Sequence, residues 1–223
     1  MVIYLPIPDE KLEKWARSLN QSRCGSGKYP AEALQVIVHG QGVSSYATST
    51  SGKGTWTTQP AATPLAGLAG PLFLLAHGMG ITSHFIAGGD RHLGKIPLPK
   101  VLSADKLAKR VKKEGLPTAF VDVRLLVCWS GYDRDHKVRG QNVLHEQPFA
   151  GQFCGSMKKE GYANIRVTGY EGKIEMAEGS DQVLVVTSRE RSVKVKGDDV
   201  QKFLNGETVP NLALADSVAK VWL

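Results

Sequence analysis

The stretch LFLLAHG at residues 72–78 and the stretch FVDVRLLVC at residues 120–128 decide the fold of this chain. Both are rich in apolar residues over the length of one strand, which is typical of strands buried inside a parallel sheet. Between them, Ser103 can cap a basic helix over residues 104–114, and Gly115 can end it. A strand, a helix and a second strand in this order predict a right-handed parallel crossover.

The same alternation continues on both sides of this unit. Residues 34–38 form a short β-branched run that stops at His39, and they predict another core strand. Apolar residues at helical spacing predict a helix over residues 148–160, and residues 165–168 supply a further strand. We therefore expect an α/β fold with a central, mostly parallel sheet flanked by helices.

The N-terminal part is predicted to lie outside this unit. An amphipathic helix over residues 9–19 and a polar loop over residues 20–30 predict an N-terminal extension at 1–30, followed by a single α/β domain at 31–223. Residues 44–64 are dense in Ser, Thr, Gly and Ala, which suits a hairpin, a mobile loop or both.

The C-terminal part is predicted to be a small addition to the sheet. Three alternating runs predict a short antiparallel meander, at residues 173–177, 182–187 and 192–196. Helices are expected near residues 199–204 and 211–221.

The composition excludes several classes of protein. With 42% hydrophobic and 22% charged residues, the chain of 223 residues has the composition of a folded domain rather than of a disordered one. The longest apolar stretch, residues 65–81, is interrupted by Pro71 and His77 and is shorter than the roughly 18 continuous apolar residues of a membrane span. The net charge of +7 favours anionic partners.

The cysteine spacing and the first residues of the chain indicate the cellular compartment in which the protein is expected. No basic leader precedes a long apolar run, so no secretory signal peptide is predicted. Cys24, Cys128 and Cys154 lack the C-x-x-C spacing of zinc or redox sites, which favours a reducing environment. We expect a cytoplasmic protein, or one exported without a signal peptide, with Cys154 in the core and Cys24 exposed.

Three residues with reactive side chains stand at predicted strand ends. His39, His77 and Cys128 each follow an apolar run and precede a glycine-containing turn. Because ligands bind at the carboxyl ends of parallel strands, we expect these side chains to meet at one edge of the sheet. An imidazole can take the proton of a nearby thiol, which makes His77 and Cys128 a candidate catalytic pair and His39 the alternative base. The backbone N–H groups of Gly78 and Cys128 could form an oxyanion hole.

At these residues the chain resembles the caspase-like (clan CD) cysteine peptidases, which include caspases, clostripain, gingipains and the self-processing domains of large bacterial toxins. The shared pattern is an apolar strand followed by His-Gly and a second apolar strand followed by Cys. Here His77 and Cys128 are 51 residues apart, close to the roughly 50 of caspases. The resemblance covers about residues 34–168. It implies a caspase-like α/β sandwich, His77 as general base or imidazolium partner, Cys128 as nucleophile, and the N–H groups of Gly78 and Cys128 as the oxyanion hole.

The sequence around the cysteine departs from the caspase pattern. Caspases have Gln-Ala-Cys-[Arg, Gln or Gly]-Gly, whereas this chain has LVCWSG at residues 126–131, so specificity for aspartate is not implied. The chain is more similar to divergent bacterial members, in which segments matching residues 39–58 and 129–147 shape the substrate pocket. The resemblance implies a cysteine endopeptidase acting on a protein or peptide substrate, as a bacterial effector, a toxin or a self-processing protease cut within 129–147 or near 20–30.

Other functions stay open at this point. The basic helix at residues 104–114 also suits a non-catalytic module that binds nucleic acid or another polyanion. The Cys-His pair equally suits a deamidase or a transacylase. No metal or other cofactor is expected, because the remaining histidines share no ligand spacing and the glycine motifs at residues 25–28 and 78–80 lack the partners of a nucleotide site.

Overall fold

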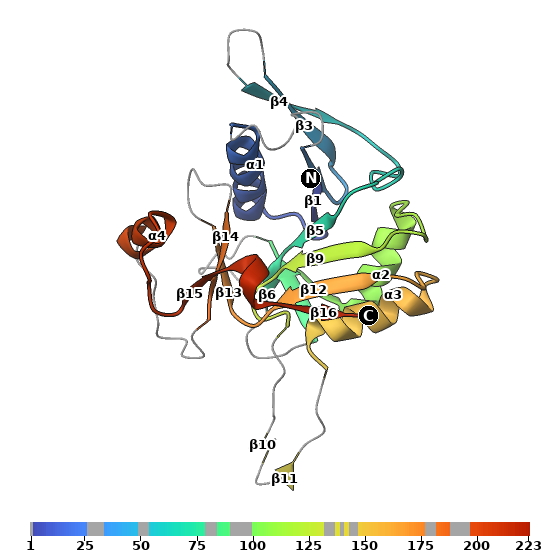
Figure 1. Ribbon diagram of the computed structural model, residues 1–223. Helices are drawn as coiled ribbons and strands as arrows, with labels where there is room; N and C mark the ends of the chain where they lie inside the picture. Colours follow the sequence, from blue (N-terminus) through green and yellow to red (C-terminus); the bar gives the residue numbers. More distant parts are fainter. Residues whose placement is uncertain are drawn as a thin grey trace, which may run out of the picture.

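The computed structural model describes most of the chain, and its main sheet has the predicted character. The described residues are 2–25, 34–48, 54–78, 84–89, 100–131, 137–138, 141–142, 147–176, 182–187 and 197–223. Over these ranges the protein is an α/β fold with a mixed, mostly parallel eight-stranded sheet, four α-helices and small antiparallel sheets (Figure 1). The predicted α/β class is therefore confirmed.

The large sheet has the strand order β16-β12-β9-β5-β1-β2-β3-β4. Its strands are β1 (Val2–Leu5), β2 (Gln35–Val38), β3 (Gly42–Thr48), β4 (Gly54–Gln59), β5 (Leu72–Leu75), β9 (Asp122–Leu126), β12 (Arg166–Tyr170) and β16 (Ala219–Trp222). The five neighbouring strands β12, β9, β5, β1 and β2 are mutually parallel, while β3, β4 and β16 are added at the two ends of this row through antiparallel pairs. The predicted parallel crossover is present, because β5 and β9 are parallel neighbours and α2 (Ala104–Lys113) lies between them in the chain.

The first strand corrects the predicted N-terminal extension. β1 lies between β2 and β5, in the interior of the large sheet, and Ile3, Tyr4 and Leu5 are fully buried. The helix that follows, α1 (Glu10–Gly25), continues beyond the predicted end at residue 19. Residues 2–25 are therefore part of the sheet and its helical cover rather than an extension outside the domain. The sequence did not predict β1, because a strand of four residues is too short to be found by periodicity.

Two hydrophobic clusters cover the two faces of the sheet. On one face α2 and α3 (Phe149–Lys159) pack on the strands, with Leu107, Val111, Phe153 and Met157 in the core cluster. On the other face α1 packs on the strands together with Ile174 and neighbouring strand residues of the C-terminal sheet. Figure 1 shows α2 and α3 together near one side of the sheet, and α1 apart from them. Ser103 caps α2 by accepting a hydrogen bond from the Lys106 N–H, as predicted.

Three small antiparallel sheets complete the fold. One contains β6 (His77–Gly78), β7 (Phe85–Gly88) and β8 (Lys100–Ser103), another contains β13 (Lys173–Met176), β14 (Val183–Val186) and β15 (Leu212–Leu214), and β10 (Lys137–Val138) pairs with β11 (Gln141–Asn142). The predicted meander is thus present in its first two strands. Its predicted third strand at 192–196 lies outside the described residues, and the third strand of this sheet is β15.

The C-terminal region corrects one prediction and confirms another. The helix expected near 199–204 is α4 (Gly197–Leu204), but the helix expected over 211–221 is replaced by β15, a 3-10 turn (Ala215–Val218) and β16. Pairing with β12 in the large sheet and with β14 in the small one overrides the local helical pattern. Among the helices of the described ranges, none is both long and apolar enough to cross a membrane.

Candidate active site

The two predicted catalytic residues end neighbouring parallel strands. β5 and β9 pair in the register Leu75 opposite Leu126, and His77 and Cys128 each follow two residues later. Parallel strands end at the same edge of a sheet, so the two residues lie side by side at the carboxyl edge. The predicted meeting of these two strand ends is therefore present in the structure.

The backbone of Gly78 lies directly against the backbone of Cys128. A Cβ atom placed on Gly78 would be 1.9 Å from the carbonyl oxygen of Cys128 and 3.2 Å from its Cα. No side chain fits in that space, so glycine is required by the close approach of two backbones rather than by its dihedral freedom. The two residues proposed from sequence as the oxyanion hole are consequently in contact.

Cys128 stands in a tight turn that is docked on the end of β12. The turn is closed by the Ser130 N–H, which donates to the carbonyl of Val127 at 3.2 Å, and Trp129 has a φ of 62°, in the left-handed region. The Ser130 hydroxyl in turn accepts a hydrogen bond from the Tyr170 N–H at 3.2 Å. A bulky residue held in this backbone conformation marks a strained turn, and such turns are concentrated at functional sites.

The thiol of Cys128 is partly buried beneath β13. The backbone N–H of Ile174 donates to the Cys128 Sγ at 3.3 Å, and Cys128 packs against the hydrophobic cluster on the α1 face. Burial raises the pKa of the Cys128 thiol, while the Ile174 N–H and the nearby Lys173 ammonium act in the opposite direction. In this conformation the thiol is therefore shielded and protonated at neutral pH.

The imidazole of His77 has a carboxylate partner that no pattern in the sequence indicates. The Asp9 Oδ2 lies 3.3 Å from the His77 Nε2; the His77 side chain is 41% exposed and that of Asp9 only 4%. Asp9 is itself fixed by the Leu12 N–H, which donates to Oδ1 at 3.0 Å, and by the Gly89 N–H, which donates to Oδ2 at 3.1 Å. Among the hydrogen bonds of the described residues, none joins His77 to the Cys128 thiol.

His39, the alternative base, is not brought to Cys128. β2 and β9 are separated by β1 and β5, so their ends lie about 14 Å apart at a strand spacing of about 4.8 Å. The His39 Nδ1 pairs instead with the Glu114 carboxylate at the end of α2. The structure therefore favours His77 over His39 as the partner of the thiol.

The remaining segments and side chains considered for the site lie away from Cys128 or outside the described residues. β3 and β4, which contain most of residues 39–58, lie on the far side of β2 from the cysteine. Most of residues 129–147, the side chain of Cys24 and three of the histidines lie outside the described residues. Cys154 is buried in the core, as predicted. Within the part of the chain that the structure describes, no three His, Cys, Asp or Glu side chains gather where they could hold a metal ion.

The chain matches no protein-family model, and its sequence matches no curated protein. The candidate site is therefore defined by the arrangement of Asp9, His77, Gly78 and Cys128.

Proposed function

We propose that this protein is a caspase-like cysteine peptidase that hydrolyses a peptide bond through Cys128 and His77. The observation that carries the proposal is the placement of both residues at the ends of adjacent parallel strands, with Gly78 against the Cys128 backbone. The buried Asp9 carboxylate beside the His77 ring adds a group that orients the base.

The proposed reaction follows from the roles of these groups. Asp9 holds the His77 Nε2, which leaves Nδ1 to take the proton of the Cys128 thiol. The thiolate attacks the peptide carbonyl carbon, and the N–H groups of Gly78 and Cys128 stabilise the oxyanion. The carbon–nitrogen bond then breaks, the imidazolium gives its proton to the leaving amine, and water hydrolyses the resulting thioester to a carboxylic acid.

The reaction also requires access to the sulfur. Ile174 on β13 covers Cys128 and donates its N–H to the Sγ atom. β13 is an edge strand of its small sheet, so it can be displaced while β14 and β15 stay paired. We therefore expect substrate to take the place of the β13 segment before His77 takes the proton of the thiol.

The experiment uses the full chain and four proteins: the wild type, Cys128→Ala, His77→Ala and His39→Ala. Each is incubated alone and with a mixed peptide library, and the products are identified by mass. We expect the wild type to release fragments with free carboxyl ends, and the first two variants to lose at least 100-fold in rate. His39→Ala is expected to keep the wild-type rate, because His39 lies on a distant strand.

Product masses separate this reaction from the related ones. A gain of about one mass unit on glutamine side chains would identify deamidation, and transfer to an added amine would identify transacylation; either result replaces peptide hydrolysis. Fragmentation that persists in Cys128→Ala, or no thiol-dependent product of any kind, would overturn the proposal.

A further inference from the structure

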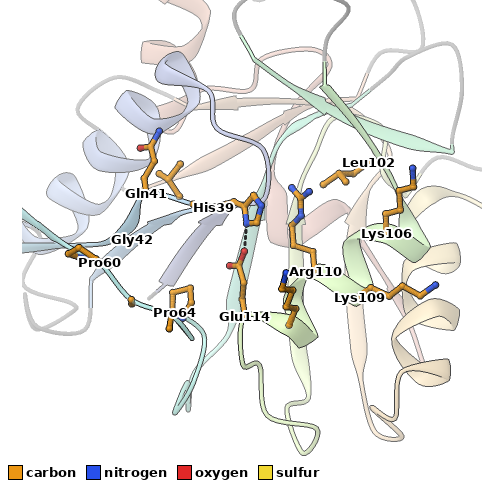
Figure 2. Close-up of a pocket in the computed structure, with 15 residues that line it drawn as sticks. His39, Gln41, Gly42, Pro60, Pro64, Leu102, Lys106, Lys109, Arg110 and Glu114 are labelled. Atoms are coloured by element: carbon orange, nitrogen blue, oxygen red, sulfur yellow. Dashed lines mark hydrogen bonds and ion pairs between the residues drawn. The ribbon is translucent and has the colours of Figure 1, made fainter.

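A pocket lies beside α2, which packs on the face of the sheet opposite to α1 and Cys128, and the basic side of α2 lines it. It has a volume of about 590 Å³, within the range of about 300–1,000 Å³ that is usual for small-molecule sites. Figure 2 shows the labelled side chains of Lys106, Lys109 and Arg110 on one side, Pro60 on the other, and the His39–Glu114 pair between them. Lys113 also lines the pocket, so four Lys and Arg side chains and one carboxylate surround it.

The positive charge of the pocket is only partly balanced. Lys109 pairs with Asp105 at 2.9 Å, whereas the Arg110 guanidinium donates to the carbonyl of Pro6, which carries no charge. Within the described ranges, Lys106 and Lys113 form no ion pair. The single carboxylate in the lining, Glu114, is occupied by His39. An anion in this pocket would consequently meet several cations without first displacing an acidic side chain.

The wall facing α2 is apolar. It contains Pro60, Ala61, Ala62 and Pro64, and Leu102 and Val38 add further apolar surface. Lys106, Arg110 and Lys113 recur at helical spacing, so they project from one side of α2 toward this wall. One small molecule in this pocket could therefore contact the cationic side and the apolar side at the same time.

We propose that this pocket binds a small organic phosphate, with the phosphate on Lys106, Arg110 and Lys113 and the organic body against the proline and alanine wall. A phosphate dianion matches several cations better than a single carboxylate does, and guanidinium and ammonium groups are the usual protein ligands of phosphate. The concave shape and the apolar wall favour a small molecule over the backbone of a nucleic acid, which needs an extended basic surface.

This site is separate from the candidate active site. Cys128 packs on the cluster of the α1 face, whereas the pocket opens beside α2, and His39 has its own partner there. The proposal therefore does not depend on the peptidase activity.

Binding is measured by titration calorimetry on the full chain, at fixed ionic strength, with AMP, glucose 6-phosphate, adenosine, glucose, sulfate and a 20-nucleotide single-stranded DNA as probes. Lys106→Ala and Lys113→Ala remove exposed cations of the pocket. Lys112→Ala is the matched control, because Lys112 is exposed on the same helix but pairs with Glu160 outside the pocket. Thermal unfolding of each variant checks that the fold is intact.

We expect AMP or glucose 6-phosphate to bind one to one, at least tenfold tighter than adenosine, glucose or sulfate. Each pocket variant should weaken that binding at least fivefold, while Lys112→Ala changes it less than twofold. Preference for AMP or for glucose 6-phosphate would identify the organic body. Equal binding of sulfate, equal losses in all three variants, tighter binding of the DNA, or no saturable binding would overturn the proposal.

Discussion

The backbone of Cys128 leaves room for only a glycine at position 78. The Cys128 carbonyl oxygen occupies the place where a Cβ atom would stand, at 1.9 Å. We expect Gly78→Ala to lower the free energy of unfolding by about 1–3 kcal/mol or more, because one of two backbones must move. Equilibrium denaturation in urea measures this loss.

Gly155 supplies the matched control for that change. It lies exposed in α3, and a Cβ atom placed there would meet no atom within 4 Å. Gly155→Ala should therefore stabilise the protein by about 1 kcal/mol, the usual difference between these residues in a helix. Equal effects of the two substitutions would show that backbone contact at Gly78 is not the cause.

The residues of the site differ in how readily they could be predicted. His77 and Cys128 were found because each directly follows an apolar run, and a strand end is visible in a sequence. Asp9 was interpreted only as part of a helix start, a role it does fill by accepting the Leu12 N–H. Its second role depends on β1 lying beside β5, and pairing between distant strands leaves no local signal.

At the scale of elements, β13 is the strand that we expect to control access to Cys128. Ile174→Gly removes a buried side chain and loosens this edge strand, whose backbone contacts the thiol, so we expect the folded protein to be alkylated at Cys128 by iodoacetamide at least ten times faster than the wild type. The wild-type rate should be below that of an exposed cysteine at pH 7.5, because burial raises the pKa of the thiol and lowers the thiolate fraction. Mass spectrometry of the Cys128 peptide gives both rates.

Val186→Gly on β14 tests whether loosening the small sheet is by itself enough to expose the Cys128 thiol to alkylation. Val186 is buried in the small cluster around Leu184 and Leu212 rather than over the thiol. Its substitution should leave the labelling of Cys128 within about twofold of the wild type at matched folded fraction. Faster labelling in both variants would mean that global unfolding, and not displacement of β13, exposes the sulfur.

The elements that could be predicted are the long or strongly patterned ones. α2 has a cap, an apolar face and a terminating glycine, and β5 and β9 are continuous runs, so their signals are local. β16 has only four residues and is partly exposed, and its pairing with β12 is decided by the rest of the sheet. The helix predicted over residues 211–221 failed for this reason.

The stability of the whole molecule should fall in alkali through its buried tyrosines. Burial raises the pKa of Tyr170 to about 12, so between pH 10 and 12 the folded protein keeps a proton that the unfolded chain has lost. Stability contributed by this group is therefore complete below pH 10 and is lost as the pH rises. We expect it to account for a loss of about 1 kcal/mol between pH 9 and pH 11.

Tyr170→Phe isolates this contribution, because it keeps the ring and removes the ionisable hydroxyl. Urea denaturation of both proteins at pH 9 and pH 11 should show a smaller decline in the variant, even if its stability at pH 9 is lower. Parallel declines would assign the alkaline loss to other groups, such as the buried Tyr4, whose pKa is also raised by burial.

The interior position of β1 has a consequence for the order in which the chain is assembled. Val2 stands opposite Gln35 on one side and Leu72 on the other, so the two neighbours of this strand follow it in the chain by 33 and 70 residues. Before β5 is available, at least one edge of β1 is open to pairing with other nascent chains. This interior strand can complete its pairing only after residue 75 has emerged, so an edge of the growing sheet stays open to other chains during synthesis.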